Sequence, residues 1–135
     1  FVVVDEPELR KKVAETTTGQ MLRFNQFCLE APVMVALVAE PPSFLSKLGS
    51  SVKDKDFYLM DIGIVAEHFC LQAAELGLGS CMIGWFDEKK LRRLLDIPSG
   101  KRVPLLISLG YPAKAGTRTK IRKPMSALFS FNRYK

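Results

Sequence analysis

The sequence predicts one layered domain, of the α/β or the α+β class, in which helices pack against a sheet. The stretch 61–85 reads as a helix that is apolar on nearly every face and that passes through Gly77 into a short strand. Short runs of β-branched and apolar residues alternate with helical patterns along the rest of the chain. The 135 residues, 47% of them hydrophobic, suffice for one core and show neither an internal repeat nor a second domain, so we treat 1–135 as a single domain.

Each element follows from a local signal. The segment Asp5-Glu6-Pro7-Glu8 has the spacing of a capping box with proline near the first helical position, and Asp87 is a candidate N-cap further along. Residues 41–56 are rich in Pro, Ser, Gly and Lys and read as a loop. The apolar pattern predicts, in order, a strand at Phe1–Val4, a helix ending near Glu15, a helix at Met21–Glu30, a strand at Pro32–Ala39, a helix at Asp56–Leu76, a strand at Gly79–Ile83, a helix at Asp87–Leu95 and a strand at Val103–Leu109.

The long helix has too few polar residues to present a broad face to water. We therefore expect it to be buried in a core or in a subunit interface. Its histidine, His68, reads as a packed or interfacial residue, and Cys70 and Cys81 read as small apolar fillers.

The length of the apolar runs and the number of cysteines predict the cellular compartment. No basic region followed by an apolar run opens the chain, and every apolar stretch is interrupted before about 18 residues, so we expect neither a signal peptide nor a membrane span. The three cysteines are an odd number without a C-x-x-C spacing, which is typical of a reducing compartment. The sequence therefore predicts a cytoplasmic protein with no membrane partner.

Charge is distributed unevenly along the chain. Residues 1–86 carry 7 basic and 11 acidic side chains, whereas residues 87–135 carry 13 basic and 3 acidic ones, so net charges of −4 and +10 make up the total of +6. Such a basic half can serve nucleic acid, an acidic membrane surface, or a bound phosphate and a negatively charged cosubstrate. Composition does not choose among these.

The spacing of the candidate residues does not match the common catalytic and nucleotide-binding motifs. Gly77, Gly79 and Gly84 have the spacing G-x-G-x-x-x-x-G where a helix passes into a strand, the reverse of the strand-to-helix turn that binds dinucleotides, and no P-loop sequence occurs. His68 and Cys70 lie two apart on a helix and so point to different faces, which excludes a dyad or a metal site made by these two alone. Any chemistry must therefore come from a cofactor.

Several segments, in order and spacing, resemble the nitroreductase family of flavin mononucleotide (FMN) enzymes. They are FVVVDEPELRKKVAE at 1–15, EAPVMVALVAE at 30–40, DIGIVAEHFCLQAAELGLGSCMIGWF at 61–86, SLGYP at 108–112 and K-x-R-x-P at 120–124. The resemblance extends over nearly the whole chain, and no single motif carries it.

The resemblance implies an α+β fold with a central, mostly antiparallel sheet flanked by helices. It further implies a homodimer of interlocked subunits, with the long helix at the interface and one FMN in each of two clefts between them. The implied activity is an FMN-dependent oxidoreductase that transfers hydride from NAD(P)H through the flavin to a nitroaromatic, a quinone or a similar electron-poor small molecule. Nucleic acid is not a partner in this interpretation.

The resemblance also assigns the cofactor-binding residues, and it assigns no catalytic side chain and no metal. Backbone amides at Met82, Ile83, Gly84 and Trp85 would face the flavin ring, where they stabilise negative charge. Lys120 and Arg122, which project to the same side of an extended segment, would bind the phosphate. The plainer alternatives are that Gly84 only permits a turn and that the two cations belong to a solvated tail.

Two departures from the family pattern leave other functions open. The chain starts where the family has already passed an Arg-Ser phosphate loop and a first helix, so we expect it to be the N-terminally incomplete part of a longer protein. Trp85 stands where a small residue is common. One alternative is a member with a degenerate flavin site that acts as a binding or interaction module, and another is a nucleic-acid binder that uses the basic half.

Overall fold

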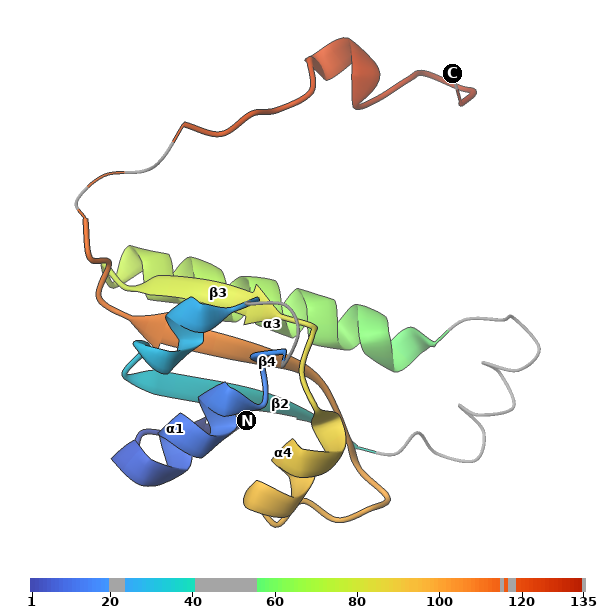
Figure 1. The fold of residues 1–135 in the computed structure, drawn as a ribbon. Helices are drawn as coiled ribbons and strands as arrows, with labels where there is room; N and C mark the ends of the chain where they lie inside the picture. Colours follow the sequence, from blue (N-terminus) through green and yellow to red (C-terminus); the bar gives the residue numbers. More distant parts are fainter. Residues whose placement is uncertain (20–23, 41–55, 115, 117–118, 135) are drawn as a thin grey trace.

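Four strands form a sheet that carries helices on both faces (Figure 1). The computed structural model describes residues 1–19, 24–40, 56–114, 116 and 119–134. In chain order the elements are β1 (Val2–Val4), α1 (Pro7–Glu15), η1 (Gln26–Leu29), β2 (Val33–Ala39), α3 (Phe57–Glu75), β3 (Gly79–Ile83), α4 (Glu88–Leu94), β4 (Arg102–Gly110) and η2 (Met125–Ala127). Each predicted strand agrees with an observed one to within one residue at either end.

The sheet has the strand order β1-β2-β4-β3, and every neighbouring pair is antiparallel. Val3 lies opposite Val35, Val35 lies opposite Ile107 on its other side, and Cys81 lies opposite Ser108. The α+β class and the antiparallel sheet are therefore confirmed. β3, the strand that leads into the predicted cofactor loop, is an edge strand.

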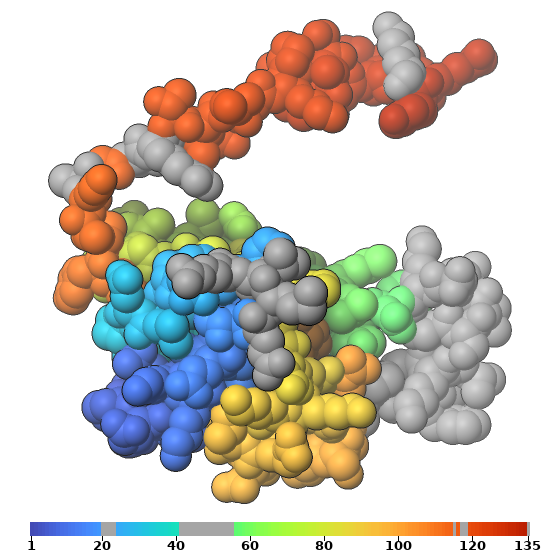
Figure 2. Space-filling model, in the orientation of Figure 1, coloured from blue at the N-terminus to red at the C-terminus, as the bar shows by residue number. Residues whose placement is uncertain are grey.

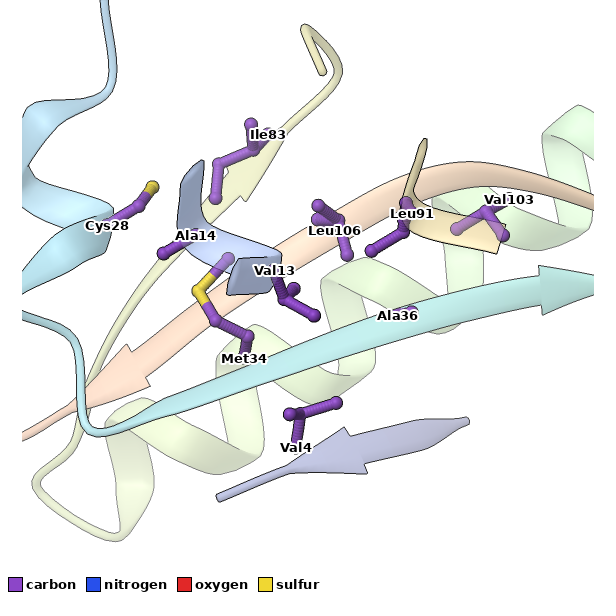
Figure 3. Packing of buried hydrophobic residues seen from close by; sticks show 10 residues of the cluster. All are labelled: Val4, Val13, Ala14, Cys28, Met34, Ala36, Ile83, Leu91, Val103 and Leu106. Carbon is purple, nitrogen blue, oxygen red and sulfur yellow. The ribbon is translucent and has the colours of Figure 1, made fainter. Parts of the chain in front are cut away.

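Alternation along the strands divides the core between the two faces of the sheet. Met34 and Ala36 belong to a cluster that α1 and α4 complete with Val13, Ala14 and Leu91 (Figure 3). The intervening residues of β2, Val35 and Leu37, belong to a second cluster with Ala66 of α3. The sheet is thus the middle layer, with α1 and α4 on one face and α3 on the other (Figure 1).

Helix α3 lies within the predicted range, but a single chain covers only one stripe of it. Its buried residues are Ala66 and Ala73. Its exposed large apolar side chains are Phe57, Leu59, Met60, Ile64, Val65 and Leu71. The interpretation as a helix buried in its own chain's core is therefore wrong, and the alternative of a subunit interface stays a prediction.

The structure also bears on the predictions for the histidine and for two of the cysteines. His68 is exposed, with its Nδ1 2.8 Å from the carbonyl oxygen of Ile64, so its own chain does not pack it, and its place in a subunit interface stays a prediction. Cys81 is exposed on β3 and does not fill a core, because β3 is the edge strand and its three middle residues are all exposed. Cys70 is half-buried against the cluster beneath α3.

The N-caps explain where two helices begin. Glu6 caps α1, since its carboxylate accepts hydrogen bonds from the amides of Glu8 and Leu9 at 3.0 and 2.6 Å. These amides also lower the pKa of Glu6. Asp87 caps α4 as predicted, with Oδ1 accepting from the Lys90 amide at 2.9 Å.

The predicted α-helix at Met21–Glu30 is wrong over its described part, residues 24–30, which contain the short 3₁₀ helix η1. Asn25, directly before η1, has a φ of 53°. A residue in this left-handed region cannot lie inside a right-handed helix, so the helical pattern is interrupted there. Most of the predicted loop at 41–56 lies outside the described residues.

The C-terminal arm, residues 119–134, lies apart from the sheet and its helices (Figures 1 and 2). It contains η2 and a T-shaped contact between Phe129 and Phe131. Its large apolar side chains are exposed, among them Ile121, Met125, Leu128 and Phe131.

No helix among the described residues is both long enough and apolar enough to cross a bilayer.

A pH prediction arises at Glu88, which ties α4 to β4. Its carboxylate accepts from Arg102 Nε at 2.8 Å, from Arg102 Nη2 at 2.9 Å and from the Val103 amide at 2.9 Å. The hydrogen bonds from Arg102 and then Val103 hold the pKa of Glu88 below its usual value. Because the pKa is lowered on folding, the stabilisation is present above the unfolded-state pKa and is lost as pH falls through the folded-state pKa.

We therefore expect Glu88→Gln to lower the free energy of unfolding by about 1 kcal/mol at pH 7 and by much less near pH 3. Urea unfolding of both proteins at the two pH values measures the difference. Glu15→Gln, which removes an exposed carboxylate at the end of α1, is the control and should have little effect at either pH. A deficit for Glu88→Gln that is equal at both pH values would contradict the assignment.

Candidate functional site

The predicted cofactor loop connects two anchored points. Ile83, at the end of β3, is buried in the core and pairs with Leu106 of β4. Asp87, the N-cap of α4, also donates its amide to the carbonyl oxygen of Thr16 at 2.9 Å. Residues 84–86 therefore span a short connection whose two ends are fixed.

The four predicted residues differ in what they can offer a ligand. Ile83 is committed to the core, so only its backbone is available. Met82 and Gly84 are exposed, and the Trp85 side chain is 71% exposed. Among the described residues, none accepts a hydrogen bond from the Trp85 amide. The loop therefore presents backbone and one large aromatic ring to whatever lies outside the chain.

The described residues give no structural reason for glycine at position 84. The glycines with positive φ in the described residues are Gly77 and Gly116, so Gly84 does not use the conformation that favours glycine in a turn. A Cβ built on Gly84 would meet no atom of the other described residues within 4 Å, its two chain neighbours aside. The turn alternative thus has no support in the backbone, whereas close approach by a planar ligand would give a reason for the missing side chain.

Sequence reasoning missed the contact that holds the far side of this loop. Asn25 Nδ2 donates to the carbonyl oxygen of Thr17 at 3.3 Å and to that of Trp85 at 3.4 Å. Asn25 and Trp85 are 60 residues apart in the sequence. The only local signal is that asparagine tolerates the left-handed backbone that Asn25 adopts, and this signal names no partner.

The comparisons with known proteins identify the family. The profile of the Nitroreductase family matches residues 1–111. This chain belongs to the nitroreductase family. A protein of Archaeoglobus fulgidus, whose name places it among NADH dehydrogenases and NAD(P)H nitroreductases, is 34% identical over 116 residues, covering 83% of this chain and 60% of its own length. An NADH dehydrogenase of Thermus thermophilus is 38% identical over 86% of this chain and 67% of its own length.

Solved structures agree on the nitroreductase fold. An FMN-dependent nitroreductase from Clostridium difficile superposes with a TM-score of 0.75 at 26% identity, covering 98% of this chain and 74% of its own. The match to the Archaeoglobus protein spans about 60% of that relative. The loop at 82–85 lies inside the part of the chain that the family profile matches, and the arm lies beyond it.

Lys120 and Arg122 lie on that arm, both exposed. Figure 1 shows the arm separated from the loop between β3 and α4, so a single chain does not bring the two halves of the predicted nitroreductase site together. Within the described residues, the ion pairs are Lys101 with Glu40 and Arg102 with Glu88, so neither arm cation is neutralised.

The residue types present fit the cofactor of the family. An FMN molecule has a planar ring with hydrogen-bond acceptors at one end and a phosphate dianion at the other. The exposed loop offers an amide that no described residue engages, beside a glycine that leaves room, and the arm offers two cations with no ion-pair partner in the described part of the chain. In the described part of the chain, no three His, Cys, Asp or Glu side chains gather as a metal centre would need.

Proposed function

We propose that this chain acts in an FMN-dependent oxidoreductase that uses NAD(P)H to reduce a nitroaromatic, a quinone or a similar electron-poor small molecule. The observation that carries the proposal is the loop at 82–85, where no described residue packs against the Gly84 Cα and none accepts a hydrogen bond from the Trp85 amide. Family membership and the FMN-dependent structural relative support the choice of cofactor. The name of the Archaeoglobus relative supports NAD(P)H as the reductant.

The roles of the residues follow from their chemistry. The Gly84 and Trp85 amides donate toward the ring, with Met82 and Ile83 contributing the strand backbone that leads to them. Lys120 and Arg122 bind the phosphate, where a guanidinium can form two parallel hydrogen bonds. FMN, when bound, would supply the two-electron redox chemistry between NAD(P)H and the acceptor. No side chain of this chain needs to act as an acid or a base.

A homodimer is the second part of the proposal. Helix α3 leaves a broad apolar face exposed and carries Asp61, Glu67 and Glu75 without any Lys or Arg. The arm is the complement, because it combines exposed apolar side chains with Lys120, Arg122 and other cations. Apolar faces of this extent mark protein interfaces, and a second copy is what would complete a site whose halves lie apart in one chain.

Trp85 allows a direct test, because it is the only tryptophan in the chain and lies in the proposed site. We expect added FMN to quench Trp85 fluorescence and to show the flavin absorbance of a bound ring between 300 and 550 nm. Anaerobic NADH or NADPH should then bleach that absorbance. Bound FMN that leaves Trp85 unquenched would place the flavin elsewhere, and no binding with excess FMN would favour the binding-module alternative.

A further inference from the structure

We propose that Asn25 is a positioning residue that holds the 84–86 loop in the orientation that the flavin ring requires. This inference rests on the proposed function. It starts from the two hydrogen bonds of the Asn25 side-chain amide, which link the carbonyl oxygen of Thr17, two residues after α1, to the carbonyl oxygen of Trp85.

The Asn25 side chain acts on the one part of the loop that its ends do not fix. Ile83 is held in the core and Asp87 is held by Thr16 and by its capping bond. Between them, the carbonyl oxygen of Trp85 is bonded to Asn25, which fixes the peptide that joins Trp85 to Phe86. The two preceding peptides, which carry the Gly84 and Trp85 amides, are then restrained from both sides.

The residues that anchor Asn25 are themselves buried and hydrogen-bonded. Thr17 is buried, and both its hydroxyl and its amide bond to the carbonyl oxygen of Ala14 in the last turn of α1. Cys28, three residues after Asn25, is buried in the main core cluster. Its amide donates to the Asn25 carbonyl oxygen at 2.9 Å. Asn25 is therefore anchored through its backbone to η1 and through its side chain to the turn that follows α1.

The backbone of Asn25 indicates why asparagine suits this position. Its φ of 53° disfavours most residues, whereas asparagine and glycine adopt it readily. Of these two, only asparagine also carries a donor with two N–H groups, which can bond two carbonyl oxygens at once. Both requirements, the backbone and the double donor, are met by one residue type.

Two variants separate the side chain from the backbone. Asn25→Asp keeps the size and the left-handed tolerance but replaces the donor by a carboxylate that faces two carbonyl oxygens. Asn25→Gly keeps the backbone conformation and removes the side chain, so it remains informative should the aspartate variant fail to fold. Gln26→Glu, an exposed amide-to-carboxylate change at the next residue, is the matched control.

We expect both Asn25 variants, without FMN, to lower the fluorescence anisotropy of Trp85 and to raise its quenching by acrylamide relative to wild type and Gln26→Glu. With FMN, we expect roughly tenfold weaker binding and a more negative flavin midpoint potential. A change in potential goes beyond what general loss of stability would produce, because it requires the environment of the ring to differ.

The outcomes distinguish this inference from the proposed function. Unchanged Trp85 anisotropy and quenching would overturn the positioning role, whether or not FMN binds. Looser Trp85 with unchanged FMN affinity and potential would also overturn it, since the loop would then not position the ring. Failure of the wild-type chain to bind FMN would instead overturn the proposed function, and the hold of Asn25 on the loop would be decided by Trp85 alone.

Discussion

Replacing Lys120 and Arg122 together with alanine should weaken FMN binding by about a hundredfold or more. Hydrogen bonds to charged groups are the strong ones, and a phosphate that loses a guanidinium and an ammonium together loses several of them. Neither side chain has an ion-pair partner among the described residues, so the double substitution leaves no buried or paired charge behind. Titration with FMN, followed by Trp85 fluorescence, measures the change.

A matched control separates a specific phosphate site from general attraction. Lys114→Ala with Lys123→Ala removes the same two charges from neighbouring exposed positions. If Lys120 and Arg122 contact the phosphate, the FMN affinity of the control variant should fall only a few-fold. Raising the salt concentration should abolish that smaller loss of affinity. Equal losses in the two double variants would contradict the assignment and would leave the arm as a diffuse basic tail.

The elements that the sequence predicts well are those whose signal is local. The alternation in β2 separates Met34 and Ala36 from Val35 and Leu37, and the structure places these pairs in different clusters. The Asp87 cap is equally local, since the carboxylate and the amide it accepts from are three residues apart. Such features require no knowledge of the rest of the fold.

The predictions that were wrong depend on contacts between residues that are far apart in the sequence or belong to different chains. A helix that is apolar all round looks the same in sequence whether its own chain or a second copy covers it, so the exposure of Ile64 and Leu71 could not be foreseen. The helix predicted at Met21–Glu30 failed because asparagine only permits a left-handed backbone, and the anchors of Asn25 at Thr17 and Trp85 select it.

The candidate site also has a part that the local sequence predicts and a part that depends on the fold. Residues 82–85 are contiguous, so one motif predicts them together. The position of Lys120 and Arg122 relative to that loop depends on the path of the arm, on which local sequence is silent. The hold of Asn25 on Trp85 joins residues with no shared pattern, and it became visible only with the fold.

Leu91→Ala should lower the free energy of unfolding by about 2–5 kcal/mol, because it would empty the centre of one face of the core. The Leu91 side chain is 0% exposed and belongs to the cluster that includes Val103 and Leu106 (Figure 3). Helix α4 has only seven residues, too few to be stable without tertiary contacts. Loss of its main buried side chain should therefore also loosen Asp87 and weaken FMN binding.

Leu71→Ala is the matched comparison, since Leu71 is 60% exposed on α3 in a single chain. Urea unfolding at several protein concentrations distinguishes the two sites. The deficit of Leu91→Ala should be the same at every concentration, because the lost contacts lie within one chain. The deficit of Leu71→Ala should be negligible if α3 faces water, and should grow with protein concentration if a second copy covers it, because association stabilises the folded state by mass action. A decrease of less than about 1 kcal/mol in the free energy of unfolding of Leu91→Ala would contradict the packing described for α4.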